Sequence, residues 1–218
     1  MIRLLKITAV LLLVSTLASL GYGVLGYLDA IRNSDDYASR ADALIAEGRG
    51  PNGLGADRLR QLLLVQDPGF LEHGGVDLST NGAGATTISQ SVSKRLGFAE
   101  FEPGIGKIRQ TGFALGLESR LTKDQILTLF LDTVKMGHGP DGMMTGFFHA
   151  SESVYGRSPA QLSEREYVRL LAVLIAPGEF RLLEDDVALA DRSARIEKLI
   201  SGSCKPLDHG DVWLEGCA

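Results

Sequence analysis

The feature that most constrains the fold is the uncharged run Ile7–Leu28 near the amino terminus. As a helix, its 22 residues are long enough to cross about 30 Å of hydrocarbon. Arg3 and Lys6 precede the run, and Asp29 is the first charged residue after it. Positive charge on the short amino-terminal side keeps that side in the cytoplasm. The sequence therefore predicts a single-pass anchor over residues 1–30 in the cytoplasmic membrane, with the rest of the chain on the extracytoplasmic (periplasmic) side.

Two other interpretations of this run are less favoured. A cleaved signal peptide would end at small residues such as Ala18 and Ser19, but the apolar run continues past them and is longer than a typical signal core. A buried helix of a soluble protein is disfavoured by the length of the run and by its place at the extreme terminus. The uncleaved anchor is the favoured interpretation.

The remaining residues divide by composition into three parts. Residues 31–55 are polar and are expected to form a stalk, with a helix over Tyr37–Glu47 and a turn at Gly50–Gly53. Residues 56–202 are long enough for one domain with a sizeable core, and residues 203–218 form a carboxy-terminal tail. The net charge of −5 argues against nucleic acid as a partner, because phosphates require a basic surface.

Polar residues and glycines gather in the segment QDPGFLEHGGVD, from Gln66 to Asp77. Apolar spacing over Asp57–Val65 predicts a short helix that Pro68 ends, so the segment lies at a helix end and in the following loop. Loops of this kind commonly carry functional groups. A lone His73, with no second histidine or cysteine ligand, is a poor metal site. We therefore expect His73 and Asp77 to hold the loop through hydrogen bonds, and no metal ligand is assigned.

A second segment, GATTISQSVSKR, is expected to form the start of a helix. On that helix, hydroxyl, amide and ammonium groups share one face, and apolar side chains share the other. A helix start of this kind suits a diphosphate, because its free N–H groups and dipole attract anions. An ordinary solvated face of an amphipathic helix is the alternative. The polar face comprises Thr86, Thr87, Gln90 and Lys94.

A third helix is expected over residues 105–118, where Lys107, Gln110 and Glu118 form a narrow polar stripe among apolar positions. Such a stripe points into a cleft or a buried network. Farther along, Thr122–Gln125 and Ser163–Glu166 have the capping-box pattern and should start two core helices. A glycine-rich turn at residues 137–142 and a last helix after residue 191 complete the expected order.

These segments, in this order from Gln66 to about Pro177, resemble the family 51 peptidoglycan glycosyltransferases. These are the transglycosylase domains of penicillin-binding proteins and their monofunctional relatives. The resemblance implies a mostly α, lysozyme-like transglycosylase domain behind an N-terminal transmembrane helix. It also implies binding of lipid II or nascent glycan carried on undecaprenyl diphosphate. Substrate-binding positions carried over from the family are Asp67, Phe70, His73, Thr86, Thr87, Gln90, Lys94, Lys107 and Glu118.

The departures from the family pattern concern the chemistry. Gln66 and Gln110 stand where the family has its two functional glutamates, the first of them thought to be the general base. An amide cannot accept a proton near neutral pH, and a positioned general base typically contributes about 10²–10⁴-fold to a rate. Basic residues, sometimes with a divalent metal, stabilise the leaving diphosphate in the family, and that metal is the only cofactor implied. The segment Leu78–Ala83 is also shorter than the family's mobile region.

The sequence therefore favours a glycosyltransferase-like protein of cell-wall biogenesis that binds the lipid-linked precursor with little or no catalysis. It would bind nascent glycan or other cell-wall synthesis proteins as well. The alternative is an active membrane-anchored polymerase with a substitute carboxylate, for which Asp67, Glu72 and Glu118 are candidates and Glu72 is favoured. Lytic cleavage is disfavoured because it also needs a carboxylic proton donor.

The only two cysteines, Cys204 and Cys217, lie in the tail. Two cysteines of an exported domain most often pair, so a disulfide is expected. Two free thiols would be the expectation in a cytosolic protein.

Overall fold

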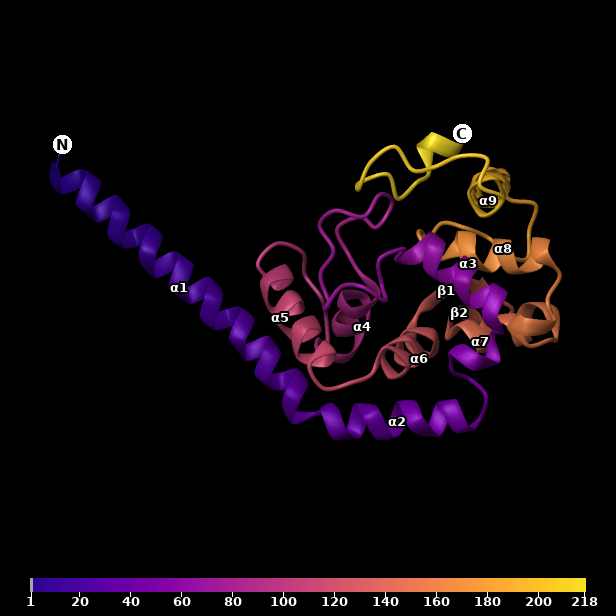
Figure 1. Ribbon diagram of the computed structural model, residues 1–218, viewed down its shortest axis with the longest axis horizontal. Helices are drawn as coiled ribbons and strands as arrows, with labels where there is room; N and C mark the ends of the chain where they lie inside the picture. Colours follow the sequence, from indigo (N-terminus) through magenta and orange to yellow (C-terminus); the bar gives the residue numbers. More distant parts are fainter. Residues whose placement is uncertain (1) are drawn as a thin grey trace.

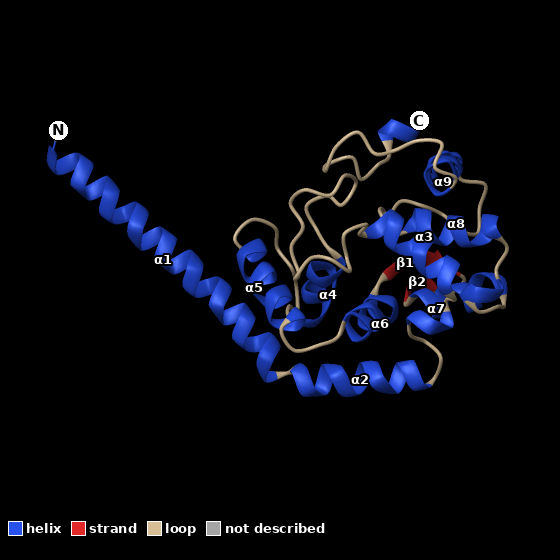
Figure 2. Cartoon of the chain, in the orientation of Figure 1, coloured by secondary structure: helices blue, strands red, loops and turns tan. Residues whose placement is uncertain are grey.

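The computed structural model describes residues 2–218, which form a mostly helical chain with one short β-ribbon (Figures 1 and 2). Three one-turn 3₁₀ helices occupy Pro51–Gly53, Pro159–Gln161 and Glu215–Cys217. The longer elements are α1 (Ile2–Arg32), α2 (Ser34–Ala46), α3 (Ala56–Gln66), α4 (Ile88–Leu96), α5 (Gly106–Glu118), α6 (Lys123–Thr133), β1 (Lys135–Gly139), β2 (Gly142–Thr145), α7 (Phe147–Tyr155), α8 (Glu164–Val173) and α9 (Val187–Ile200).

Helix α1 runs away from the body of the molecule, and its carboxy-terminal part lies beside α5 (Figure 1). Residues Leu5–Arg32 are long and apolar enough to cross a membrane, and the most apolar stretch is not buried by the protein. Length and composition alone would also fit a signal sequence. The exposed leucines and valines of α1 need an apolar environment, which supports membrane anchoring.

The contact between α1 and α5 depends on glycines that let the two backbones touch. A Cβ atom at Gly112 of α5 would overlap the carbonyl oxygen of Gly23 of α1, and one at Gly116 would lie 2.7 Å from the Tyr27 carbonyl oxygen. Small residues at such a crossing allow close packing of membrane helices. An ion pair of 2.7 Å between Arg109 and Asp29 adds a charged contact between the two helices. Helix α1 is therefore held directly against the domain.

Gly112→Ala is expected to lower the free energy of unfolding by about 1–3 kcal/mol, the usual cost of overpacking. The added methyl group would push α1 away from α5, because backbone rather than a flexible side chain opposes it. Thermal unfolding of the full chain in detergent measures the effect. Gly21→Ala is the control, since a Cβ there meets nothing within 4 Å. Equal stability of the two variants would contradict the close contact.

Residues 31–55, expected to form a stalk, pack against the domain instead of standing clear of it. Helix α2 covers the predicted Tyr37–Glu47 helix and lies along α6. Ala41 and Leu44 are buried there, and Leu54 belongs to the core. Apolar residues spaced four and three apart give α2 a stripe that can be buried only against another helix. This segment thereby becomes one wall of the site described below.

Both expected capping boxes start core helices. Thr122 and Gln125 exchange side-chain and backbone hydrogen bonds at the start of α6, and Ser163 and Glu166 do the same at α8. Each box satisfies two of the N–H groups that a helix start leaves without partners. The helices that follow carry fully buried side chains such as Tyr167, which packs edge-on against Phe147.

Two elements differ from the sequence expectation. The glycine-rich region expected to be only a turn forms an antiparallel ribbon, β1–β2, which buries Met136 and Met144. Helix α9 begins at Val187 rather than after residue 191, because the Asp186 carboxylate accepts the backbone N–H of Leu189 and caps the helix. Neither strand is long enough to show a clear alternation in the sequence.

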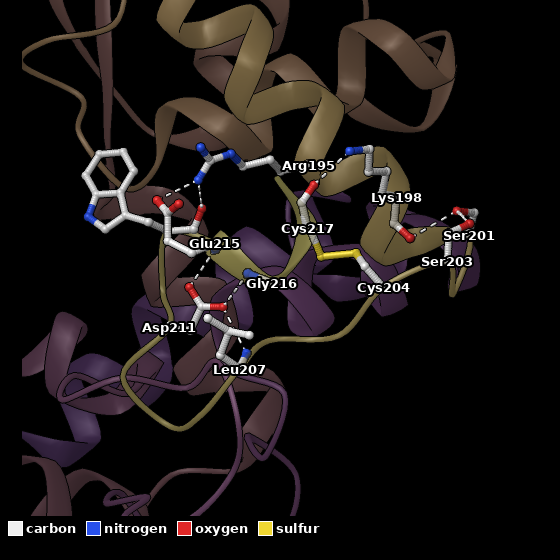
Figure 3. The surroundings of a disulfide bond; sticks show 11 residues. Arg195, Lys198, Ser201, Ser203, Cys204, Leu207, Asp211, Glu215, Gly216 and Cys217 are labelled. Carbon is white, nitrogen blue, oxygen red and sulfur yellow. Dashed lines mark hydrogen bonds and ion pairs between the residues drawn. A yellow bond between two sulfur atoms is a disulfide. The ribbon is translucent and has the colours of Figure 1, made fainter.

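The tail folds into a closed loop that the expected disulfide between Cys204 and Cys217 ties together (Figure 3). Asp211 accepts backbone N–H groups from Leu207, Glu215 and Gly216, and so fixes the interior of the loop. The tail also pairs with the short segment between the first two motifs, through Gly82 N–H to the Asp208 carbonyl and Gly84 N–H to the His209 carbonyl. The predicted tail is thus a brace for that segment.

Replacing both cysteines by serine is expected to lower the free energy of unfolding by about 3 kcal/mol. The cysteines are 13 residues apart, and closing a loop of this size restricts the unfolded chain by roughly that amount. Denaturant unfolding with and without reductant measures the effect. The reductant should not change the free energy of unfolding of the double serine variant. The prediction would be contradicted if the reductant also left that of the unmodified chain unchanged.

Candidate functional site

A cleft of about 750 Å³ lies between α2, α4, α6 and β1. Four of its lining side chains are basic, namely Arg40, Lys94, Arg95 and Lys135, and among the described residues Asp132 is the only lining carboxylate. Asp132 is 2.6 Å from Arg40 and 3.7 Å from Arg49, so its charge is already balanced. The cleft therefore carries an excess of positive charge on a chain that is acidic overall.

Gln66, which the motif resemblance puts at the first family glutamate position, lies in this cleft. It is the last residue of α3, and Asp67 turns the chain away immediately after it. The Gln66 side chain makes no hydrogen bond to any residue that the structure describes, and it is only partly exposed. Its amide is free to bind a hydroxyl group but cannot remove a proton.

Gln110, at the second family glutamate position, does not line the cleft with Gln66. It is 1% exposed on α5, and its Nε2 donates a 2.7 Å hydrogen bond to the carbonyl oxygen of Gln90. Its Oε1 is buried and has no hydrogen-bond partner among residues 2–218. The polar stripe expected on this helix therefore points into a buried network at this position, one of the two outcomes that the pattern allowed.

Hydrogen bonds to side chains of the protein occupy the start of α4. The Asp67 carboxylate accepts the Ile88 N–H at 2.8 Å, and Thr87 and Gln90 form a capping box. The N–H groups of Thr87, Ile88 and Gln90, which were expected to be free for a diphosphate, are therefore already bonded. The side chains of Thr87 and Gln90 are buried rather than turned toward a ligand. The capping box was visible as Thr-x-x-Gln in the sequence, but the Asp67 contact spans 21 residues and was not.

Thr86 and Lys94 do line the cleft, and Lys107 lies beside them. Lys107 Nζ donates to the Thr86 hydroxyl at 2.8 Å and to the Ala85 carbonyl at 2.9 Å. Burial lowers the pKa of Lys107, and the positive charge of Lys94 lowers it further. Two neighbouring ammonium groups that repel one another favour an anion between them.

Asp67, His73 and Asp77 form a compact polar cluster whose ligand-type atoms lie within 4.8 Å of one another. His73 Nδ1 accepts the Gly75 N–H, so in the neutral ring the proton is on Nε2, which donates to Asp67 at 3.1 Å. Neither ring nitrogen then has a lone pair for a metal. Burial raises the pKa of Asp77, but N–H groups of Thr80 and Ser79 outweigh it and bring the pKa to about 2. The cluster holds the loop, and Phe70 fills the core below it.

None of the three proposed substitute carboxylates lines the cleft. Glu72 is exposed in a separate hollow with Asp77 and Leu78. Asp67 is fully buried and bonded, and Glu118 accepts hydrogen bonds from Ser89 and from Lys123 Nζ. Sequence proximity favoured Glu72, but the loop carries its side chain away from Gln66.

The residues that sequence reasoning missed are Arg40, Arg95, Asp132 and Lys135. Arg95 Nη1 donates to Ser91 at 2.7 Å, so two lining side chains of α4 contact each other. Their spacing of four on one helix was the available signal. Burial lowers the pKa of Arg95 to about 10, which leaves the guanidinium charged at neutral pH. Arg40 could not be found, because α2 was expected to be a stalk.

The lining residues do not fit a divalent cation. Divalent cations such as Mg²⁺ prefer carboxylate and other oxygen ligands. The cleft offers one carboxylate, Asp132, which two arginines already engage, and basic side chains surround it.

Comparison with known proteins places this geometry in context. The family model described as Transglycosylase matches residues 55–200. Penicillin-binding protein 1B of Buchnera aphidicola is 30% identical over 129 residues, which cover 53% of this chain and 17% of the relative. A biosynthetic peptidoglycan transglycosylase of Rhodopseudomonas palustris is 30% identical over 130 residues, or 54% of each chain. Penicillin-binding protein 1A of Escherichia coli is 26% identical over 158 residues, or 66% of this chain and 18% of the relative.

The chain thus spans about half or less of the length of these relatives. The family match nevertheless covers most of the chain, from the residue before α3 to the end of α9, and includes the whole helical domain. The motif order, the helical domain and the family match agree, and the chain belongs to the transglycosylase family, the family 51 peptidoglycan glycosyltransferases.

Proposed function

We propose that this protein binds lipid II or nascent glycan in the cationic cleft at the membrane surface and polymerises it little or not at all. The observation that carries the proposal is the composition of the cleft. Basic side chains line it, Gln66 lies in it, and Asp132 is held by two arginines. The motif resemblance puts Gln66 at the position of the general base. Such a cleft can hold an anionic, hydroxyl-rich ligand but has no free proton acceptor.

Each part of the cleft would have a distinct role in binding. Lys94 and Lys135 would neutralise the diphosphate, and Arg95 would add a charge-assisted contact. Gln66 would hydrogen-bond a sugar hydroxyl. The close packing of α1 on α5 would keep the cleft at the bilayer, on the extracytoplasmic side, where the lipid of the ligand remains inserted. Other cell-wall synthesis proteins are further partners under this proposal.

Lys94→Ala is expected to weaken binding of lipid II by about tenfold, the loss of one charge-assisted contact. The dependence of binding on salt should also become flatter, because one fewer charge is screened. Binding to lipid II in detergent or in liposomes, at two salt concentrations, measures both. Lys205→Ala, at an exposed lysine in the tail, is the control. No measurable binding by the unmodified chain would end the proposal.

A second candidate is a polymerase that uses Asp132 as its base. Asp132 is the one described carboxylate that lines the same cleft as Gln66, which is the observation in its favour. It would have to leave Arg40 to accept a proton. Polymerisation by the unmodified chain that Asp132→Asn abolishes, and that Glu72→Gln leaves intact, would select this candidate over the first.

A further inference from the structure

A second hollow, of about 270 Å³, lies between α9 and the disulfide-closed loop of the tail. Arg195 and Glu215, on its rim, are seen in Figure 3 close to the disulfide. The family motifs do not contribute to it. Its lining residues are Glu179, Phe180, Ala188, Asp191, Arg192, Arg195, Trp213 and Glu215.

Arg192 has a buried guanidinium with no partner. The residue is 4% exposed, and its Nε and Nη1 atoms are buried without a hydrogen bond. No described residue makes an ion pair or hydrogen bond with this side chain. Arg195, one turn farther along α9, is by contrast bonded to the Glu215 carboxylate at 2.6 Å and to the Trp213 carbonyl at 3.2 Å. A buried cation without a partner is costly and calls for an oxyanion.

The nearby acidic side chains do not supply an oxyanion to Arg192. Asp211 uses its carboxylate on three backbone N–H groups of the tail, and Glu215 is taken by Arg195. Burial lowers the pKa of Arg192, and the positive charge of Arg195 lowers it further. The negative charges of Asp211 and Glu215 act in the opposite direction, and the pKa is lowered to about 10. The Arg192 side chain therefore remains charged at neutral pH.

The mouth of the hollow carries an aromatic ring and acidic side chains, in contrast to the buried Arg192 cation. Trp213 is 43% exposed and packs edge-on against Phe180, with 6.3 Å between ring centres. Glu179 and Asp191 are exposed beside it and make no ion pair with the described residues. The hollow thus places a cation at its floor, an aromatic face on its wall and two acids at its rim.

We propose that this hollow binds a small zwitterion of the amino-acid type. Its carboxylate would meet Arg192, its ammonium group would lie between Glu179 and Asp191, and its side chain would rest on Trp213. Multiply charged anions are disfavoured by the two rim acids. The volume is just below the range of drug-sized pockets, which suits an amino acid or a dipeptide. This site does not depend on the function proposed for the cleft.

Trp213 is the only tryptophan of the chain, so its fluorescence reports on this hollow alone. The full chain in detergent is titrated with alanine and with alanyl-alanine, and a saturable change is expected. N-acetyl-alanine lacks the ammonium group and alaninamide lacks the carboxylate, so each should bind about tenfold or more weakly. No saturable change with either zwitterion, or equal binding of alaninamide, would overturn the proposal.

Arg192→Met should weaken binding of the zwitterion by about 10–100-fold, since it removes a charged hydrogen-bond partner. The same variant should keep or raise the thermal midpoint, because it removes an uncompensated buried charge. Arg165→Gln, at an exposed arginine of α8, is the matched control for both measurements. A lower midpoint with unchanged binding would make Arg192 a structural residue and overturn the proposal.

A second variant tests the rim without touching the core. Glu179→Gln with Asp191→Asn changes only exposed side chains, so the fold should be unaffected. It should weaken binding of alanine about tenfold and leave binding of N-acetyl-alanine unchanged or tighter, because the latter has no ammonium group and its carboxylate is repelled by the rim acids. An equal loss for both ligands, or for neither, would contradict the assigned orientation. This test holds even if Arg192→Met fails to fold.

Discussion

Gln66→Glu is expected to raise lipid II polymerisation by about 10²–10⁴-fold over the unmodified chain, the usual contribution of a positioned general base. Gln66 lines the cleft and has no hydrogen-bond partner among the described residues, so an introduced carboxylate would be free to act. The basic lining residues would keep that carboxylate ionised. Glycan chains formed from lipid II in detergent are separated by gel electrophoresis and measured as initial rates.

Gln66→Ala is the matched control, since it opens the same position without adding a base, and it should remain as inactive as the parent. Gln66→Glu combined with Lys94→Ala should lose part of the gain, because the diphosphate would be held less well. A folded Gln66→Glu variant that binds lipid II and stays inactive would show that the cleft no longer aligns two sugars. Binding of lipid II without polymerisation would then be the leading function.

Gln110→Glu is expected to destabilise the fold by about 3 kcal/mol or more at neutral pH, rather than to assist catalysis. The Gln110 amide donates to the Gln90 carbonyl oxygen from a position 1% exposed. A carboxylate there would face that oxygen without a proton, and no cation among the described residues makes a hydrogen bond to the Gln110 side chain. An unpaired buried charge of this kind costs several kcal/mol.

The pH dependence of this loss has a definite sign. Burial would raise the pKa of the introduced carboxyl above its unfolded value of about 4.3. Stability should match that of the neutral form below this value, fall as the pH rises toward the raised pKa, and stay low above it. Urea unfolding across this range measures the effect. Gln110→Met, which cannot ionise, should show a loss that does not change with pH, and identical profiles for the two variants would contradict the argument.

The expected effects of Gln66→Glu and Gln110→Glu differ, although the sequence alone does not distinguish the two positions. The motif resemblance puts both glutamines at positions of family glutamates. The structure gives Gln66 an open cleft and Gln110 a buried hydrogen bond. Restoring both acids together is therefore expected to do less than Gln66→Glu alone, because the second change weakens the helix that carries Lys107.

The sequence by itself determined the helical class, the candidate membrane helix and the family. These follow from local patterns: the uncharged run Ile7–Leu28, the capping boxes at Thr122 and Ser163, and the spacing of the motifs. Such patterns act within a few residues along the chain, so they can be read without the neighbours. The Cys204–Cys217 pairing was accessible for the same reason, since only two cysteines exist.

Only the tertiary structure decided which polar residues face the cleft. Thr87 turns inward to donate to the Gly75 carbonyl oxygen, Asp67 accepts the N–H of the adjacent Ile88, and Gln110 donates to the Gln90 carbonyl oxygen. The same packing brings Arg40 of α2 to Asp132 of α6, across 92 residues of sequence. It also sets the tail on the segment between the first two motifs. A helical pattern shows which side chains share a face, but the partner across that face is chosen by contacts between distant segments.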